Sequence, residues 1–226
     1  MMDWTALWLT ARLALVTSGV LLAVGVPLAW WLATTRWRGR MFVEAVVALP
    51  LVLPPTVIGF YVLIGLGPNS PPGRWIEALC GHALPFSFAG LVVGSVLYSL
   101  PFAVQPFTAG FRSVNRELLE AAWSVGATKL RTFFRIAIPL AWPGLLSGMV
   151  LSFAHTLGEF GVVLMVGGNI PGVTRTVSVS IYDAVQSLDY ASAGRTAAAL
   201  LLISFVILSL TYKLQRDFRL APERPR

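Results

Sequence analysis

The sequence predicts an all-α fold, a polytopic helical membrane protein with about five transmembrane helices in one domain over residues 1–226. Of its 226 residues 56% are hydrophobic and only 12% are charged, whereas about a quarter of the residues in soluble domains are charged. The charges also lie in clusters between long uncharged segments. A hydrocarbon core about 30 Å thick needs roughly 20 apolar residues in a helix, and several of these segments reach that length.

The uncharged segments predict spans at about 13–35, 45–66, 88–111, 136–158 and 194–212. Prolines within these spans remove backbone donors that lipid cannot replace, so the helices are expected to pack against one another.

The segment 160–190 follows the fourth span and is expected to be a re-entrant or outer segment. Its apolar part, from Phe160 to Thr174, is only 15 residues long and ends in Gly and Pro residues. This length is too short for a full span.

The Lys and Arg residues are distributed unevenly along the chain. Thirteen of the 17 fall in the segment 36–40, in the segment 112–135, or in the tail 213–226. The positive-inside rule therefore predicts a multi-pass membrane protein with its N-terminus outside and its tail in the cytoplasm. Membrane lipid is an expected partner, and nucleic acid is not, because a nucleic-acid binder needs its basic residues on one solvated face.

The segment 112–135, here called the elbow, is longer than two antiparallel spans need and is patterned rather than disordered. Asn115 can cap a first helix that Gly126 ends, and Thr128 can cap a second helix over residues 129–136. Two short helices with exposed aromatic and basic side chains suit a groove on a partner protein. The alternative is an amphipathic pair that lies on anionic lipid.

The elbow resembles the signature of ABC-importer permeases, since it reads Glu120-Ala121-Ala122, three residues, Gly126, nine residues and Ile136-x-Ile138-Pro139, with Ile138 in place of leucine. The resemblance covers roughly residues 10 to 215. It implies the type I ABC importer permease fold in the bacterial inner membrane, in which the elbow inserts into a cleft on an ATPase subunit. The residues that it places at this contact are Glu120, Ala121, Ala122, Gly126, Ala127, Leu130, Arg131 and Phe134.

The resemblance implies a non-catalytic subunit. Neither of the two lysines, Lys129 and Lys213, lies in a phosphate-binding loop, so ATP and Mg²⁺ are expected on a separate ATPase chain and no cofactor on this one. One cysteine and two histidines are too few for a metal site. Two ATPase copies, a second copy of this chain, and a periplasmic or extracellular oxyanion-binding protein are the implied partners.

A narrower likeness follows the fourth span. The motifs Leu157-Gly158-Glu159-Phe160-Gly161, Gly168-Asn169-Ile170-Pro171-Gly172 and Thr174-Arg175-Thr176 are similar to those of permeases for molybdate and for sulfate or thiosulfate. The compact chain looks most like the molybdate permeases, with tungstate as a chemically near-identical substrate. The gate or pathway candidates are Glu159, Asn169 and Arg175.

Glu159 would repel an anion when ionised, so two roles stay open for it. It can act in a gate, or it can have a structural role, capping backbone amides or pairing with an arginine such as Arg175. His155, one turn earlier, is expected to make an interhelical hydrogen bond.

Two other classes of function fit the sequence less well than an ATP-driven oxyanion importer. A secondary transporter would need coupling ionisable residues within the spans or an inverted repeat, and the sequence has neither. A membrane enzyme would need clustered carboxylates, histidines or a nucleophile at a membrane face. Glu117 and Glu120 are the close acidic pair on the predicted inner face, and the elbow accounts for them.

Overall fold

The computed structural model describes residues 2–219, and within them every regular element is helical, which confirms the all-α class. The predicted tail 213–226 begins within the last helix, and residues 220–226 lie outside the described residues. The elements are α1 (Trp4–Thr34), α2 (Arg40–Ala48), η1 (Leu49–Leu51), α3 (Pro55–Leu66), α4 (Pro71–Cys80), α5 (Phe88–Arg112), α6 (Arg116–Ser124), α7 (Lys129–Thr132), η2 (Phe133–Ala137), α8 (Ile138–Leu157), α9 (Gly161–Gly167), α10 (Val177–Gln186) and α11 (Tyr190–Arg219).

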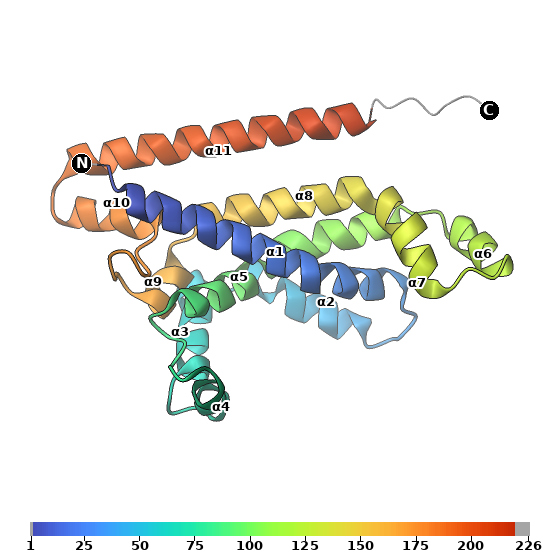
Figure 1. The fold of residues 1–226 in the computed structure, drawn as a ribbon, viewed down its shortest axis with the longest axis horizontal. Coiled ribbons are helices and arrows are strands. Elements are labelled where there is room, and N and C mark those ends of the chain that lie inside the picture. Colours follow the sequence, from blue (N-terminus) through green and yellow to red (C-terminus); the bar gives the residue numbers. More distant parts are fainter. Residues whose placement is uncertain (1, 220–226) are drawn as a thin grey trace.

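Four helices of the described chain are long and apolar enough to cross a bilayer. They are α1, α5, the continuous helix Lys129–Leu157, and Tyr190–Ser209 within α11. A fifth crossing is obtained if the bent pair Arg40–Leu51 and Pro55–Leu66 is counted as one span. In Figure 1, α1, α5, α8 and α11 run in roughly one direction, with α6 and α7 at one end and α9 and α10 at the other, whereas α3 runs across them.

The segment 45–66, where a span is expected, is bent rather than straight. Its two halves meet at 110°, and Pro54 between them has an extended backbone with ψ 139°. Proline has no N–H to donate and disfavours the helical conformation of the residue before it. Because Pro55 follows Pro54 directly, the first helix has to end here, and Pro55 begins α3.

The second elbow helix also differs from expectation. It does not stop before Pro139 but continues through the π-helical segment η2 into α8, so that one helix runs from Lys129 to Leu157. Pro139 cannot donate to the hydrogen-bond ladder, and the π-helical turn Phe133–Ala137 lies just before it. The elbow is therefore joined to the fourth span without a hinge loop.

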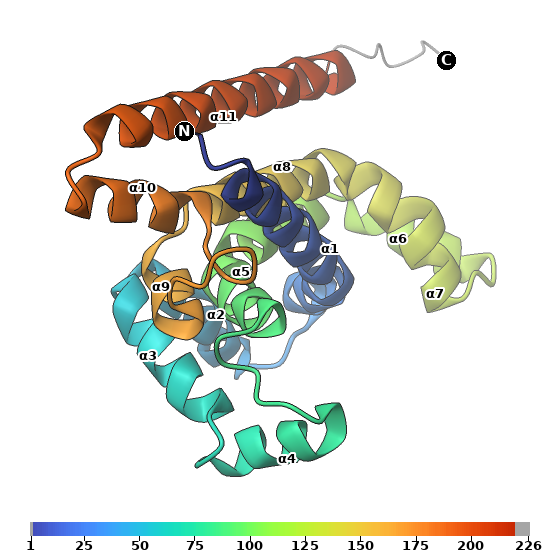
Figure 2. The ribbon, with the colours of Figure 1, turned by 60° about the vertical axis from the view of Figure 1, so that its left-hand side comes forward.

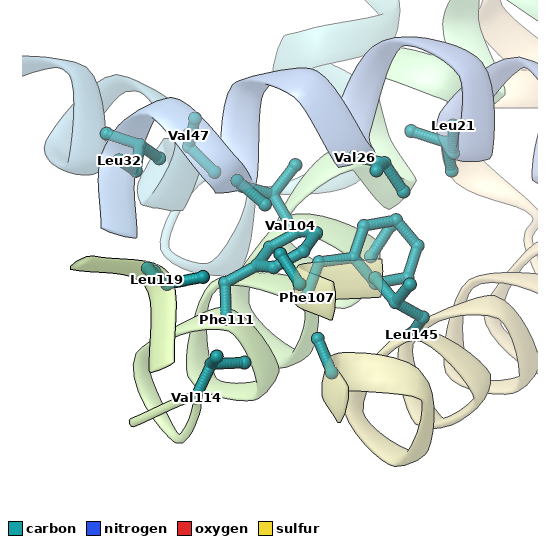
Figure 3. Packing of buried hydrophobic residues seen from close by; sticks show 14 residues of the cluster. Leu21, Val26, Leu32, Val47, Val104, Phe107, Phe111, Val114, Leu119 and Leu145 are labelled. Atoms are coloured by element: carbon teal, nitrogen blue, oxygen red, sulfur yellow. The ribbon is translucent and has the colours of Figure 1, made fainter. Parts of the chain in front are cut away.

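The core lies where α1, α5 and α8 pack together, side by side in both ribbon views (Figures 1 and 2). Phe107 of α5 is fully buried at its centre (Figure 3). Phe111, Val114 and Leu119 extend the same cluster from the end of α5 into α6. The bundle core and the elbow thus share one apolar cluster.

Helices α5 and α8 approach at the level of their backbones. A methyl group added at Gly144 would lie 2.6 Å from Cα of Gly110 and 2.8 Å from the carbonyl oxygen of Pro106. Such contacts need residues without a side chain, as is usual where membrane helices pack closely.

Candidate functional site

Local hydrogen bonds form the elbow as the sequence predicts. The side chain of Asn115 accepts a hydrogen bond from the backbone N–H of Glu117 at 2.9 Å, and the Thr128 hydroxyl accepts one from the N–H of Arg131 at 3.2 Å. Gly126 has φ +83°, a left-handed conformation that other residues adopt only with strain. The predicted caps and the glycine turn are confirmed.

The inner side of the elbow is fixed to the bundle. Leu119 and Val114 are buried in the core cluster, and the ring of Phe133 lies 5.3 Å from the ring of Trp30 in α1. A force applied to the elbow therefore reaches α1 and α5 through packed side chains.

The outer side of the elbow presents apolar groups at the surface of the chain. Val125 is 85% exposed and Leu130 is 68% exposed. Their exposure has no role in stabilising the isolated chain, and such apolar patches are typical of protein interfaces. The exposed large apolar residues of the elbow are Leu118, Trp123, Val125, Leu130 and Phe134.

The residues expected to dock a partner lie on α6, in the turn between α6 and α7, on α7, or in η2. Ala121 is exposed and Ala122 and Ala127 are half-buried, so their small side chains leave the backbone accessible. Glu120 accepts a hydrogen bond from Nε of Arg116 at 2.8 Å, in an exposed ion pair. Pairs of this kind contribute little to stability, so the Glu120 carboxylate can exchange Arg116 for a partner's donor at small cost.

A cavity of about 550 Å³ lies at the break between α8 and α9. Four of the residues around it carry polar side chains, namely Thr56, Tyr98, His155 and Glu159. Glu159 itself is only 5% exposed. Helices α3, α5 and α8 and the start of α9 thus converge on one buried carboxylate.

His155 makes the interhelical hydrogen bond that the sequence predicts. Its Nδ1 lies 2.9 Å from Oγ of Ser99 in α5, and its ring stacks on Phe102 with centroids 3.9 Å apart. Sequence reasoning does not single out Tyr98 and Ser99. For Ser99 the available signal is its spacing from Ser95, four residues apart on one face of a largely apolar helix.

Arg175 does not pair with Glu159, which corrects that expectation. Its guanidinium lies 3.5 Å from Oδ2 of Asp183, and its Nε donates to Oδ1 of Asn169 at 2.6 Å. Asn169 in turn donates to Oδ1 of Asp183 at 3.1 Å. The two pathway candidates are thus linked to α10, and the charge of Arg175 is compensated.

Comparison with known proteins defines the class. The family described as the binding-protein-dependent transport system inner membrane component matches residues 25–219, and the chain belongs to this family. It is 51% identical to the molybdenum transport system permease protein ModB of Azotobacter vinelandii, over 95% of each chain. It is 32% identical to a probable sulfate transport system permease protein of Chlorella vulgaris, over 91% of this chain and 77% of that one.

Solved structures show the same fold. The MetNI methionine ABC transporter in an inward-facing conformation matches with a TM-score of 0.73 and 16% identity, over 96% of this chain and 95% of that chain. A bacterial ABC transporter involved in the import of alginate matches with a TM-score of 0.72 and 20% identity, over 95% and 79%. The type I ABC importer permease fold is therefore confirmed.

Proposed function

We propose that this chain is the membrane-spanning, non-catalytic subunit of an ATP-driven importer that carries molybdate into the bacterial cytoplasm. The observation that carries the proposal is the 51% identity to a molybdenum permease over 95% of both chains. Tungstate is the nearest chemical alternative, and the similarity to a sulfate permease makes sulfate the second candidate.

The proposed assembly contains two copies of this chain, two ATPase copies that hold ATP and Mg²⁺, and a binding protein that delivers the oxyanion from outside. The elbow end faces the cytoplasm in this arrangement. The cluster of Lys129, Arg131 and Arg135 near that end supports the orientation. The exposed apolar side chains of the elbow are then the surface on which the ATPase docks.

The continuous helix from Lys129 to Leu157 couples the elbow to the pathway. It has 29 residues and therefore spans about 44 Å at 1.5 Å per residue. Its far end lies at the Glu159 cavity, and its near end carries Leu130 on the docking surface. Closure of the ATPase pair would displace the elbow and, through this rigid helix, switch the cavity between outward and inward access. The free energy comes from ATP on the partner.

The docking step is tested by substituting Gly126 with valine. Valine at φ +83° is strained by about 1–3 kcal/mol, which is enough to change the turn. The matched control is Gly81→Val at the end of α4, because Gly81 also has a positive φ of 77° and no atom within 4 Å of an added Cβ. We expect the wild type and the Gly81 variant to co-purify with the ATPase, and the Gly126 variant to lose it.

Retention of the ATPase by the Gly126 variant would contradict docking through the elbow. Loss of the ATPase from both glycine variants would also contradict it, because Gly81 lies on a different part of the chain.

A further inference from the structure

A second cavity, here called the inner cavity, lies among α1, α2 and α5 and has a volume of about 600 Å³. Its apolar wall includes Leu32, Val47 and Val104 (Figure 3). The volume is many times the roughly 30 Å³ that one water occupies. The inner cavity therefore has room for a hydrated tetrahedral ion.

The inner cavity lies beside the elbow. Arg112, one of its lining residues, is the last residue of α5, and α6 begins four residues later at Arg116. In the proposed orientation the elbow end of the bundle faces the cytoplasm. An ion that leaves the pathway on that side therefore has to pass near this cavity.

Gln105 places an amide within the membrane-spanning part of α5. It lies two helical turns before Arg112, about 10 Å further into the bilayer, and its exposed side chain lines the inner cavity. The amide has no hydrogen-bond partner among the described residues. Lipid against this face would leave the amide unsatisfied, which is costly. We therefore expect this face of α5 to meet water or a polar ligand in the assembled transporter.

The donors that this cavity offers are few and well defined. The hydroxyl of Thr108 donates to the carbonyl of Val104, and that of Ser113 donates to the carbonyl of Gly110, so neither proton is free. The Arg112 guanidinium has five N–H donors, and its contact with Glu44 uses one nitrogen, Nη2. Arg112 and the amide of the cavity-lining glutamine are therefore the side chains that can donate to an anion.

Glu44 limits how tightly an anion can be held. Its carboxylate pairs with Arg112, and the two side chains are 39% and 49% exposed. Such exposed pairs contribute little to stability, so an oxyanion can share the guanidinium with Glu44 at small cost. The negative charge of Glu44 also repels the same ligand. A bound dianion is therefore attracted but not trapped.

We infer that the inner cavity is a transient binding site for a tetrahedral oxyanion on its way to the cytoplasm, with Arg112 and Gln105 as its donors. The inference rests on the proposed function. Charge-assisted hydrogen bonds from a guanidinium are strong and match the geometry of oxyanions. Repulsion by Glu44 offsets part of this attraction, which suits a site that has to be entered and left quickly.

The test measures binding of radiolabelled molybdate to the detergent-purified complex of this chain and its ATPase, by equilibrium dialysis at up to millimolar molybdate without nucleotide or binding protein. Arg112→Gln should weaken binding about tenfold or more, and Gln105→Leu about three- to tenfold, because they remove a charged and a neutral donor. Glu44→Gln should strengthen binding by about threefold or more, because it removes a negative charge and frees the guanidinium.

The opposite signs expected for Arg112→Gln and Glu44→Gln separate a binding role from a structural one, since either change breaks the same ion pair. Weaker binding in both variants would overturn the inference, because it would mean that the pair acts by holding α2 against α5. Unchanged binding in Arg112→Gln and Gln105→Leu would overturn it as well.

Thiol labelling in lipid nanodiscs tests the location of the site. In a Cys80→Ser background, which removes the one cysteine of the chain, Ala109→Cys places a thiol on the cavity wall. The control, Leu15→Cys, places one on an exposed apolar part of α1. A charged, membrane-impermeant thiol reagent should modify the cavity position and spare the control, and molybdate should slow that modification.

A cavity thiol that the reagent cannot reach, or whose modification molybdate does not slow, would overturn the inference. Failure of the proposed function is distinguishable, because binding and protection are measured without transport. A wild-type complex that takes up molybdate but does not bind it in the inner cavity would contradict this inference alone. A complex that binds molybdate there but accumulates no oxyanion would contradict the proposed function.

Discussion

The single residue Thr10 links helix α1 to the start of helix α10. Its hydroxyl donates to the carbonyl of Ala6 at 2.8 Å and accepts from the backbone N–H of Val177 at 2.8 Å. Val177 is the first residue of α10, where a helix has no carbonyl of its own for that N–H. One buried hydroxyl thus satisfies a donor 167 residues away.

Replacing Thr10 with valine keeps the shape and removes this bond. The N–H of Val177 would be left buried without an acceptor, so we expect a loss of about 1–3 kcal/mol in stability. Thermal unfolding in detergent, followed by tryptophan fluorescence, measures the change.

The matched control for Thr10 is Thr108→Val. The Thr108 hydroxyl is also buried, but it donates only to the carbonyl of Val104 in its own helix. Thr108→Val should therefore lower the stability clearly less than Thr10→Val does. Equal destabilisation by the two variants would contradict the claim that the hydrogen bond between Thr10 and Val177 stabilises the fold more than a bond within one helix.

At the scale of elements, the contact between α5 and α8 sets the shape of the bundle. Glycines at Gly110 and Gly144 bring the two backbones together, and the ring of Phe107 fills the space beside Gly148, where an added methyl group would lie 2.5 Å from it. Membrane helices gain little from the hydrophobic effect against lipid, so close packing of this kind supplies much of the association.

We expect Gly144→Ala to push α8 away from α5, because the added methyl group would collide with backbone atoms that cannot move aside. The cost should be about 1–3 kcal/mol. Gly19→Ala in α1 is the control, since no atom lies within 4 Å of the added group, and it should stabilise the helix by about 0.5–1 kcal/mol. The same unfolding measurement should separate the two; shifts of the same sign and size would contradict close packing at Gly144.

Sequence reasoning succeeds for the elements whose signals are local. The caps at Asn115 and Thr128 and the turn at Gly126 depend on residues within one helical turn, and the structure contains all three. The 110° bend after η1 could have been predicted from the adjacent prolines Pro54 and Pro55, but its angle depends on the neighbouring helices.

Contacts between side chains of different elements are the part that sequence reasoning misses. Arg175 is expected to pair with Glu159, yet its partner is Asp183 of α10. Likewise, no local pattern places Ser99 beside His155, 56 residues away. The composition of the Glu159 cavity therefore depends on how the helices pack.

At the scale of the whole molecule, the apolar surface of the chain indicates further partners. A groove of about 470 Å³ runs along α2, α3 and α5 and is lined by apolar side chains such as Leu49, Val62 and Leu97. Helix α11 is also mostly exposed, since only 17% of the residues in its apolar stretch within Tyr190–Ser209 are buried. Lipid covers part of this surface, and in the proposed assembly a second copy of the chain closes the pathway.

The most direct measurement is uptake of molybdate by vesicles that contain this chain and its ATPase, with ATP enclosed and the binding protein outside. We predict that molybdate accumulates only when ATP and the binding protein are both present, and that excess tungstate competes. Accumulation that continues without ATP and follows an ion gradient would contradict an ATP-driven importer and favour a secondary transporter. Failure to accumulate molybdate, tungstate or sulfate by an intact complex would contradict the oxyanion assignment.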